Sequence, residues 1–368
     1  MTKKDAPKSR TLRTLALGVA LSVSLFPAGV NMLFIGNSFT MRHELPAIVG
    51  ALLEEGDAGT AVKTEIVGYG GKSLFHFWEL FHSYNRLKVA SFSQNQWDAE
   101  ISALKDLAAC EKSPAFYDDY CRTLNENAFW RSNNREMKLN WNGEKGAVRF
   151  GITTHQNWSR IADKNENIDF VVLQSWQDVT DSAETGYMKY AQMFAAVAIE
   201  NGAKPVLYFT APNSHNAAPV TNAVKKDEII NTCRIAAAGA KKMNAIVVPL
   251  PLALMLAQDS EEPVARTLTF RYKKDFHPNN TMAYLTACTF YAALTGKSPE
   301  GLKMNTVSEN KLQTIHGEAI TEANKGEAIS SAVDPDGGSP KTVFDDETRL
   351  FLQRTAWKAV ELYRSGNF

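Results

Sequence analysis

The stretch Met32-Leu33-Phe34-Ile35-Gly36-Asn37-Ser38 joins a short apolar run to a turn that contains glycine. Four large apolar residues in a row predict a buried β-strand, and the Gly-Asn-Ser sequence after them predicts a turn at the end of that strand. A serine in such a turn is exposed, as a nucleophile has to be. The same turn is also compatible with a serine that only caps the following helix.

Outward from this stretch, strand-like segments alternate with segments of helical periodicity. The segments that predict further strands are 62–67, 170–173, 205–209 and 245–250. The segments that predict helices are 45–55, 188–199, 229–243, 282–294 and 347–363. Strands rich in Val, Ile and Leu that alternate with helices predict an α/β fold, with helices on both faces of a parallel sheet.

Polar residues and glycines gather where four of these strands end, at 36–40, 68–73, 174–178 and 210–216. In a parallel sheet covered by helices, the ligand site lies beyond the C-terminal ends of the strands. The sequence therefore predicts an active site at that edge, built from these four segments.

Residues 31–368 are expected to form a single domain with one long insertion. The insertion, at about 80–169, separates two core strands by far more than a typical connection, and it is rich in Trp, Tyr, Phe and Asn. We expect it to cover the active-site end of the sheet. A second irregular stretch, at about 305–341, is expected to be a surface excursion.

Residues 1–30 have the pattern of a signal peptide. Basic residues precede an apolar run from Leu15 to Phe26, which is shorter than the about 20 residues that a membrane span needs. Small residues near Ser24 and near Gly29 offer two cleavage sites, and a retained anchor is the alternative. We expect export to the periplasm or the extracellular space.

The four cysteines fit an oxidising compartment. Cys110 and Cys121 lie close together in a loop-like region and are expected to pair, whereas Cys233 and Cys288 lie in helical patterns typical of buried small side chains. The 40 basic residues balance the 40 acidic ones, so nothing in the charge favours nucleic acid as a partner. The histidines lack the spacing of a metal site, so neither a metal nor another cofactor is expected.

Gly36-Asn37-Ser38 resembles the first sequence block of the SGNH (GDSL-like) hydrolase superfamily, in the branch that has G-N-S instead of G-D-S. The sequence His43-Glu44-Leu45-Pro46, ahead of the next helix, is similar to that branch too. Three further segments resemble the remaining blocks, in the right order: Gly70-Gly71-Lys72-Ser73, Leu173-Gln174-Ser175-Trp176-Gln177-Asp178 and Asp275-Phe276-His277-Pro278.

The resemblance implies a flavodoxin-like sheet of the SGNH hydrolase type and a serine esterase that forms an acyl-enzyme. In that mechanism Ser38 is the nucleophile, His277 is the base and Asp275 orients the imidazole. The backbone N–H groups of Ser38 and Gly71 would bind the oxyanion, together with one side-chain amide.

Two departures from the superfamily pattern leave roles open. The third block usually supplies an Asn, and here Gln174 is the expected oxyanion donor with Gln177 as the alternative. The last block is usually Asp-x-x-His, but Lys274 stands three residues before His277. Asp275 is only two residues before His277, so a Ser–His dyad oriented by a backbone carbonyl is the alternative to a triad.

An aromatic, Asn-rich insertion in an exported protein favours a sugar ligand, and secreted members of the superfamily often remove O-acetyl groups from polysaccharides. An O-acetyl ester of a carbohydrate is therefore the expected substrate. The alternatives are a sulfate ester, a lipase-type ester, or glycan binding without catalysis; no nucleic acid is expected, and no membrane after signal cleavage. The residues expected to line the substrate site are Asn37, His43, Gln177, Thr210, Asn213 and His215.

Overall fold

The sheet at the centre of the molecule has five parallel strands in the order β2-β1-β3-β4-β5. This computed structural model describes residues 29–68, 73–74, 77–78, 167–175, 186–210, 224–271, 277–307 and 343–368. The strands are β1 (Gly29–Gly36), β2 (Ala61–Gly68), β3 (Phe170–Gln174), β4 (Lys204–Tyr208) and β5 (Ile246–Val248). The strand order is that of flavodoxin-like folds, so the predicted fold class is confirmed.

Successive side chains of β1 point into two separate cores. Met32 and Phe34 belong to the larger core, and Leu33 and Ile35 belong to the smaller one on the opposite face. Because both faces are buried, a strand needs apolar residues at every position, which explains the continuous apolar runs in the sequence.

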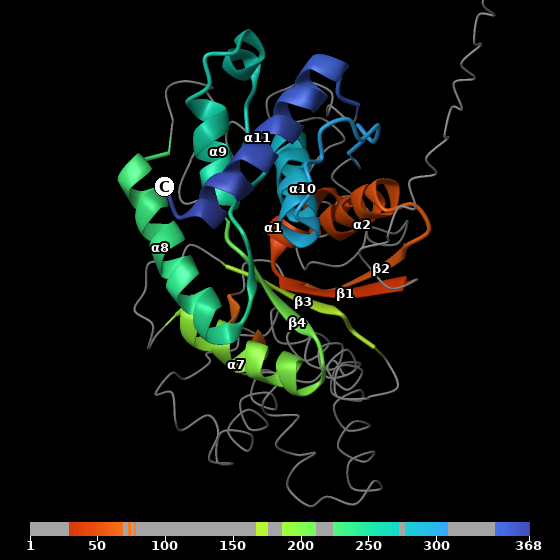
Figure 1. Cartoon of the computed structure of the whole chain (residues 1–368), viewed down its shortest axis with the longest axis vertical. Coiled ribbons are helices and arrows are strands. Elements are labelled where there is room, and N and C mark those ends of the chain that lie inside the picture. The colour runs from red at the N-terminus through yellow and green to blue at the C-terminus, as the bar shows by residue number, and fades with distance from the viewer. Residues whose placement is uncertain are drawn as a thin grey trace, which may run out of the picture.

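Helices cover both faces of the sheet (Figure 1). On the face of the larger core lie α2 (Leu45–Gly56), α9 (Leu250–Gln258), α10 (Asn280–Thr295) and α11 (Asp346–Ser365). On the other face lies α7 (Tyr187–Glu200), and α8 (Lys226–Met243) contributes side chains to both cores. The three-layer αβα arrangement predicted from the sequence is therefore present.

Helix α9 was not predicted from the sequence. A strand was expected over 245–250, whereas β5 ends at Val248 and α9 begins at Leu250. Leu250, Leu252 and Leu254 are all buried, and α9 packs against α8, α10 and α11. A helix that is covered on several sides is apolar all round, so it lacks the periodicity by which a half-exposed helix is recognised.

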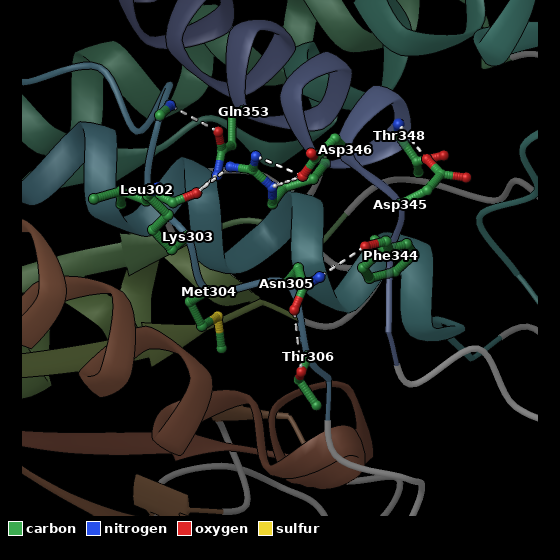
Figure 2. Close-up of polar contacts among 12 residues, drawn as sticks. Leu302, Lys303, Met304, Asn305, Thr306, Phe344, Asp345, Asp346, Thr348 and Gln353 are labelled. Atoms are coloured by element: carbon green, nitrogen blue, oxygen red, sulfur yellow. Dashed lines mark hydrogen bonds and ion pairs between the residues drawn. The ribbon is translucent and has the colours of Figure 1, made fainter.

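A buried polar network fixes the C-terminal helix to the segment that follows α10 (Figure 2). The side chain of Gln353 is 0% exposed, donates to the carbonyl of Leu302 (2.9 Å) and the hydroxyl of Tyr284 (3.0 Å), and accepts from the N–H of Gly301 (3.0 Å). At the start of α11, Asp345 accepts a hydrogen bond from the N–H of Thr348 (2.7 Å), which is a helix cap.

Several predictions lie outside the described residues: the signal peptide up to residue 28, most of the insertion, most of the second irregular stretch, and the Cys110–Cys121 pair. Cys233 and Cys288 are described, and both are free and buried, as expected. Burial raises the pKa of the Cys233 thiol to about 12. None of the helices in the described ranges is long and apolar enough to cross a membrane.

Candidate active site

Ser38 and His277 meet at the C-terminal edge of the sheet. The Oγ of Ser38 lies 2.8 Å from the Nε2 of His277, although 239 positions separate the two residues in the sequence. Both side chains are partly exposed, whereas Asn37, Phe39 and Pro278 beside them are buried. The contact is within the range for proton transfer from a hydroxyl to an imidazole.

The turn that carries Ser38 is fixed by the side chain of Asn37. Strand β1 ends at Gly36, and the four-residue helix α1 (Ser38–Met41) begins directly after Asn37. The Oδ1 of Asn37 accepts from the N–H of Phe39 (3.0 Å), so Asn37 is the N-cap of α1. Ser38 is then the first helical residue, and its N–H is one of those that a helix leaves without an intrahelical partner.

Gln174, the last residue of β3, holds this turn from the neighbouring strand. Its Oε1 accepts from the backbone N–H of Asn37 (2.6 Å) and from the hydroxyl of Thr40 (2.9 Å). Its Nε2 donates to the Oδ1 of Asn37 (3.0 Å) and to the carbonyl of Ser175 (2.5 Å). The N–H of Asn37 needs an acceptor and the carbonyl of Ser175 needs a donor, so the oxygen and nitrogen of the Gln174 amide cannot be exchanged.

The expected role of Gln174 as oxyanion donor finds no support in this arrangement. An amide nitrogen has two hydrogens, and both are donated to atoms of the protein. The residue is 2% exposed, so it lies beneath the turn and away from any ligand. The structure instead shows Gln174 as a scaffold of the turn that carries Ser38.

The scaffold continues to the next strand through Ser175 and Thr210. The Oγ of Ser175 accepts from the N–H of Thr210 (2.9 Å), and the hydroxyl of Thr210 donates to the carbonyl of Ser175 (3.2 Å). The ends of β1, β3 and β4 are thus joined by one chain of buried hydrogen bonds. Thr40 and Ser175 were not identified from the sequence, because a hydroxyl residue at a strand end has no distinguishing pattern.

His277 is held by the start of α10. The side-chain oxygen of Asn279 accepts from the N–H of Met282 (3.1 Å), so Asn279 is the N-cap of that helix. The Nδ2 of Asn279 donates to the carbonyl of Thr269 (2.8 Å), and Pro278 forms a β-bridge with Arg271. The backbone on the C-terminal side of His277 is therefore anchored to the rest of the fold.

His43 and Asn37 do not line a substrate site in this structure. Each is 1% exposed. The Nε2 of His43 lies 3.1 Å from the carbonyl oxygen of Pro278, and Asn37 caps α1 and contacts Gln174. Side chains buried in bonds to the protein itself are not accessible to a ligand, so the expectation that they contact substrate is not supported.

Aromatic and cationic groups pack around the Ser38–His277 contact. The ring of Phe39 lies 5.6 Å from the imidazole of His277, and the guanidinium of Arg271 lies 5.1 Å from the centre of the same phenyl ring. Arg271 is buried, and it partly opposes the effect of burial, which raises the pKa of Tyr208 at the end of β4 well above its usual range.

Five of the expected site residues lie outside the described residues: Gly71, Asp275, Gln177, Asn213 and His215. Their expected roles stay predictions. Within the described ranges, no three His, Cys, Asp or Glu side chains are grouped so as to hold a metal ion.

No protein-family model matches this sequence, and no curated protein matches it either. Among solved structures, the chain is similar to a protein from Slackia heliotrinireducens provisionally described as an SGNH hydrolase. The identity is 17% and the TM-score 0.40, over 73% of this chain and 100% of that chain. It is also similar to a gut microbial diltiazem-metabolizing enzyme, at 12% identity and a TM-score of 0.34, over 74% of this chain and 48% of that chain. Similarities this distant assign no activity.

Proposed function

We propose that this chain is a serine esterase of the SGNH type, with Ser38 as nucleophile and His277 as general base. The observation that carries the proposal is the 2.8 Å contact between Ser38 Oγ and His277 Nε2 at the C-terminal edge of a parallel sheet. A hydroxyl that is hydrogen-bonded to an imidazole and partly exposed at this edge has the arrangement that nucleophilic catalysis requires.

In the proposed reaction, Ser38 Oγ attacks the carbonyl carbon of an ester while its proton passes to Nε2 of His277. The carbonyl oxygen becomes an oxyanion, which the N–H groups of Ser38 and Gly71 bind. The carbon–oxygen bond to the alcohol then breaks, and the alcohol leaves with the proton from His277. Water attacks the acyl-enzyme, His277 accepts its proton, and the acid leaves as that proton returns to Ser38.

Three roles in this mechanism rest on residues outside the described ranges, and the oxyanion N–H of Gly71 is the first. Because both amide hydrogens of Gln174 are already donated, Gln177 remains as the side-chain oxyanion donor. Asp275 is the proposed partner of His277 Nδ1, with a backbone carbonyl as the alternative. We propose an O-acetyl group on a carbohydrate as the substrate, and this part rests on the aromatic, Asn-rich composition of residues 80–169.

The test is hydrolysis of p-nitrophenyl acetate by the full chain and by Ser38→Ala, His277→Ala and Asp275→Ala. Ser365→Ala, at an exposed position far along α11, is the matched serine control. We expect Ser38→Ala and His277→Ala to lose on the order of 10⁴-fold or more in kcat, and Ser365→Ala to equal the unmodified chain. A similar loss in Asp275→Ala favours a triad, and a small loss favours the dyad.

A substrate panel decides among the ester classes. We expect acetyl esters and acetylated polysaccharides to be cleaved faster than p-nitrophenyl octanoate or p-nitrophenyl sulfate. Preference for the octanoate would identify a lipase-type enzyme, and cleavage of the sulfate alone would identify a sulfate ester hydrolase. No turnover of any ester, together with binding of a glycan that Ser38→Ala retains, would replace the esterase proposal with a binding function.

A further inference from the structure

A buried histidine joins the segment after Ser38 to the segment after His277. His43 lies in the short 3-10 helix η1 (Arg42–Glu44), five positions after Ser38. Its Nε2 lies 3.1 Å from the carbonyl oxygen of Pro278, the residue that follows His277. We propose that His43 is a positioning residue, which sets the distance between the base and the nucleophile; this inference rests on the proposed function.

The hydrogen bond has one direction. The carbonyl of Pro278 can only accept, so Nε2 of His43 carries the hydrogen and donates it. His43 is 1% exposed, so the bond is shielded from water and is stronger than an exposed one. The bond involves no reacting atom, yet it ends one residue from the base.

The backbone at His43 points to the same role. His43 has φ 60° and ψ 13°, and Glu44 has φ 52° and ψ 42°, so two consecutive residues that are not glycine are in the left-handed region. This conformation is unfavourable for residues with a Cβ, and it persists only where surrounding contacts impose it. Here it turns the chain between α1 and α2 so that the imidazole faces the segment that carries His277.

The two halves of the reactive pair are held by separate parts of the fold. Gln174 fixes the turn of Ser38, and Asn279 fixes the start of α10 after His277. The His43–Pro278 bond connects these two parts directly. Its loss is therefore expected to leave each part folded while the Oγ–Nε2 contact becomes longer or more variable.

Three substitutions of His43 distinguish the effect of its side-chain hydrogen bond from the effect of its left-handed backbone conformation. Asn accepts the left-handed conformation well, but its amide is too short to reach Pro278. Gln places its amide nitrogen close to the position of Nε2 and can donate the same bond. Leu removes the donor and keeps a side chain of similar bulk.

The experiment measures kcat and KM for p-nitrophenyl acetate with His43→Gln, His43→Asn and His43→Leu. The concentration of active enzyme, by which kcat is calculated, is taken from complete labelling of the serine with a fluorophosphonate probe. Gln353→Ala, whose buried amide bonds to Gly301, Tyr284 and Leu302, controls for a general loss of stability. We expect His43→Asn and His43→Leu to lower kcat by about 10–10²-fold with KM unchanged, since small misplacements of reacting groups have effects of this size. His43→Gln is expected to recover most of the rate.

Two results would overturn the inference. If all three variants keep the unmodified kcat per labelled serine, the bond does not set the reactive distance. If His43→Gln is as slow as His43→Leu while Gln353→Ala is equally slow, the effect is one of stability. Failure of the proposed function looks different: the unmodified chain itself would turn over no ester and Ser38 would not be labelled, and the inference would fall with it.

Discussion

Two buried glutamines of this molecule stabilise different parts of the fold. Gln174 and Gln353 are 2% and 0% exposed, and each amide both donates and accepts inside the protein. Three of the hydrogen bonds of Gln174 go to the turn that carries Ser38, whereas those of Gln353 go to α10 and the segment after it. Figure 2 shows Gln353 beside Leu302. Two amides with similar hydrogen bonding therefore hold different parts of the fold, and only Gln174 contacts the turn of the proposed nucleophile.

Among changes to the residues around Gln174, the largest expected effect comes from Gly36→Ala, which disturbs the scaffold that Gln174 forms. A Cβ at Gly36 would overlap Gln174 Oε1 and Thr40 Oγ1, and would lie 2.9 Å from Gln174 Cβ. Both side chains would have to move, and Ser38 with them. We expect kcat to fall by roughly 10³-fold, because nucleophile and oxyanion donor are displaced together.

The matched control for this change is Gly29→Ala in the same strand. A Cβ at Gly29 would meet only the carbonyl of Ala61, at an ordinary contact distance of 3.8 Å. We expect the unmodified kcat for this variant. Equal losses of kcat in both glycine variants would show that β1 tolerates no added methyl group. The effect of Gly36→Ala would then not be due to its contacts with Gln174 and Thr40.

Gln174→Ala is the direct test of the comparison. It leaves the N–H of Asn37, the hydroxyl of Thr40 and the carbonyl of Ser175 without their partner. We expect kcat to fall by about 10²-fold through displacement of Ser38, and the free energy of unfolding to fall by about 2–3 kcal/mol. Ester hydrolysis and urea unfolding measure the two effects. A normal kcat in this variant would show that Gln174 contributes to stability and does not position Ser38.

Gln174→Glu asks whether the amide's donor hydrogens matter. One oxygen of a buried carboxylate would still accept from the N–H of Asn37 and the hydroxyl of Thr40, which lowers its pKa. The other oxygen would face the Ser175 carbonyl and Asn37 Oδ1, both acceptors. We expect burial and these acceptors to outweigh the donors and to raise the pKa above the about 4.3 of an unfolded Glu. The protonated form keeps one donor. The free energy of unfolding of Gln174→Glu is then highest below the unfolded pKa, and it falls as the pH rises through the raised folded pKa. We expect the gap in thermal midpoint from the unmodified chain to widen from pH 4.5 to pH 8; a constant gap would contradict this.

Gln353→Ala should affect stability alone. The N–H of Gly301 and the carbonyl of Leu302 would lose a buried partner, at about 2–3 kcal/mol in the free energy of unfolding. The kcat of the folded fraction should not change, because the amide of Gln353 bonds to Gly301, Leu302 and Tyr284 and not to the turn of Ser38. Urea unfolding and ester hydrolysis on the same sample give both values, and a slower enzyme would show that the two regions are coupled.

The smallest expected effect is that of Thr210→Val, at the outer end of the scaffold. Valine keeps the shape of Thr210 but cannot donate to the Ser175 carbonyl. We expect a loss of about 1 kcal/mol in the free energy of unfolding and no detectable change in kcat. A clear fall in kcat would show that the whole chain of bonds from β4 to β1 positions Ser38.

The fold was predictable because its signals are local. Continuous apolar runs such as Phe34-Ile35 and Val171-Val172 mark strands buried on both faces, and helical periodicity marks α2 and α11. Helix α9 escaped prediction for the opposite reason: it is covered on several sides and has no polar face. The contact between Ser38 and His277 was also expected from the sequence, since each residue lies in a recognisable motif, and the structure places the two side chains 2.8 Å apart.

The roles of Gln174, Asn37 and His43 depended on the tertiary structure. The sequence by itself determined the α/β class and the expectation that Ser38 and His277 meet where the strands end, because both follow from periodicity and motifs within short stretches. Only the folded chain decided where these polar side chains direct their hydrogen bonds. The partners of Gln174 in the turn of Ser38 lie over 130 positions away in the sequence, and the partner of His43 lies 235 positions away. An amide or imidazole has the same chemistry facing a ligand or facing the scaffold, and burial decides between the two.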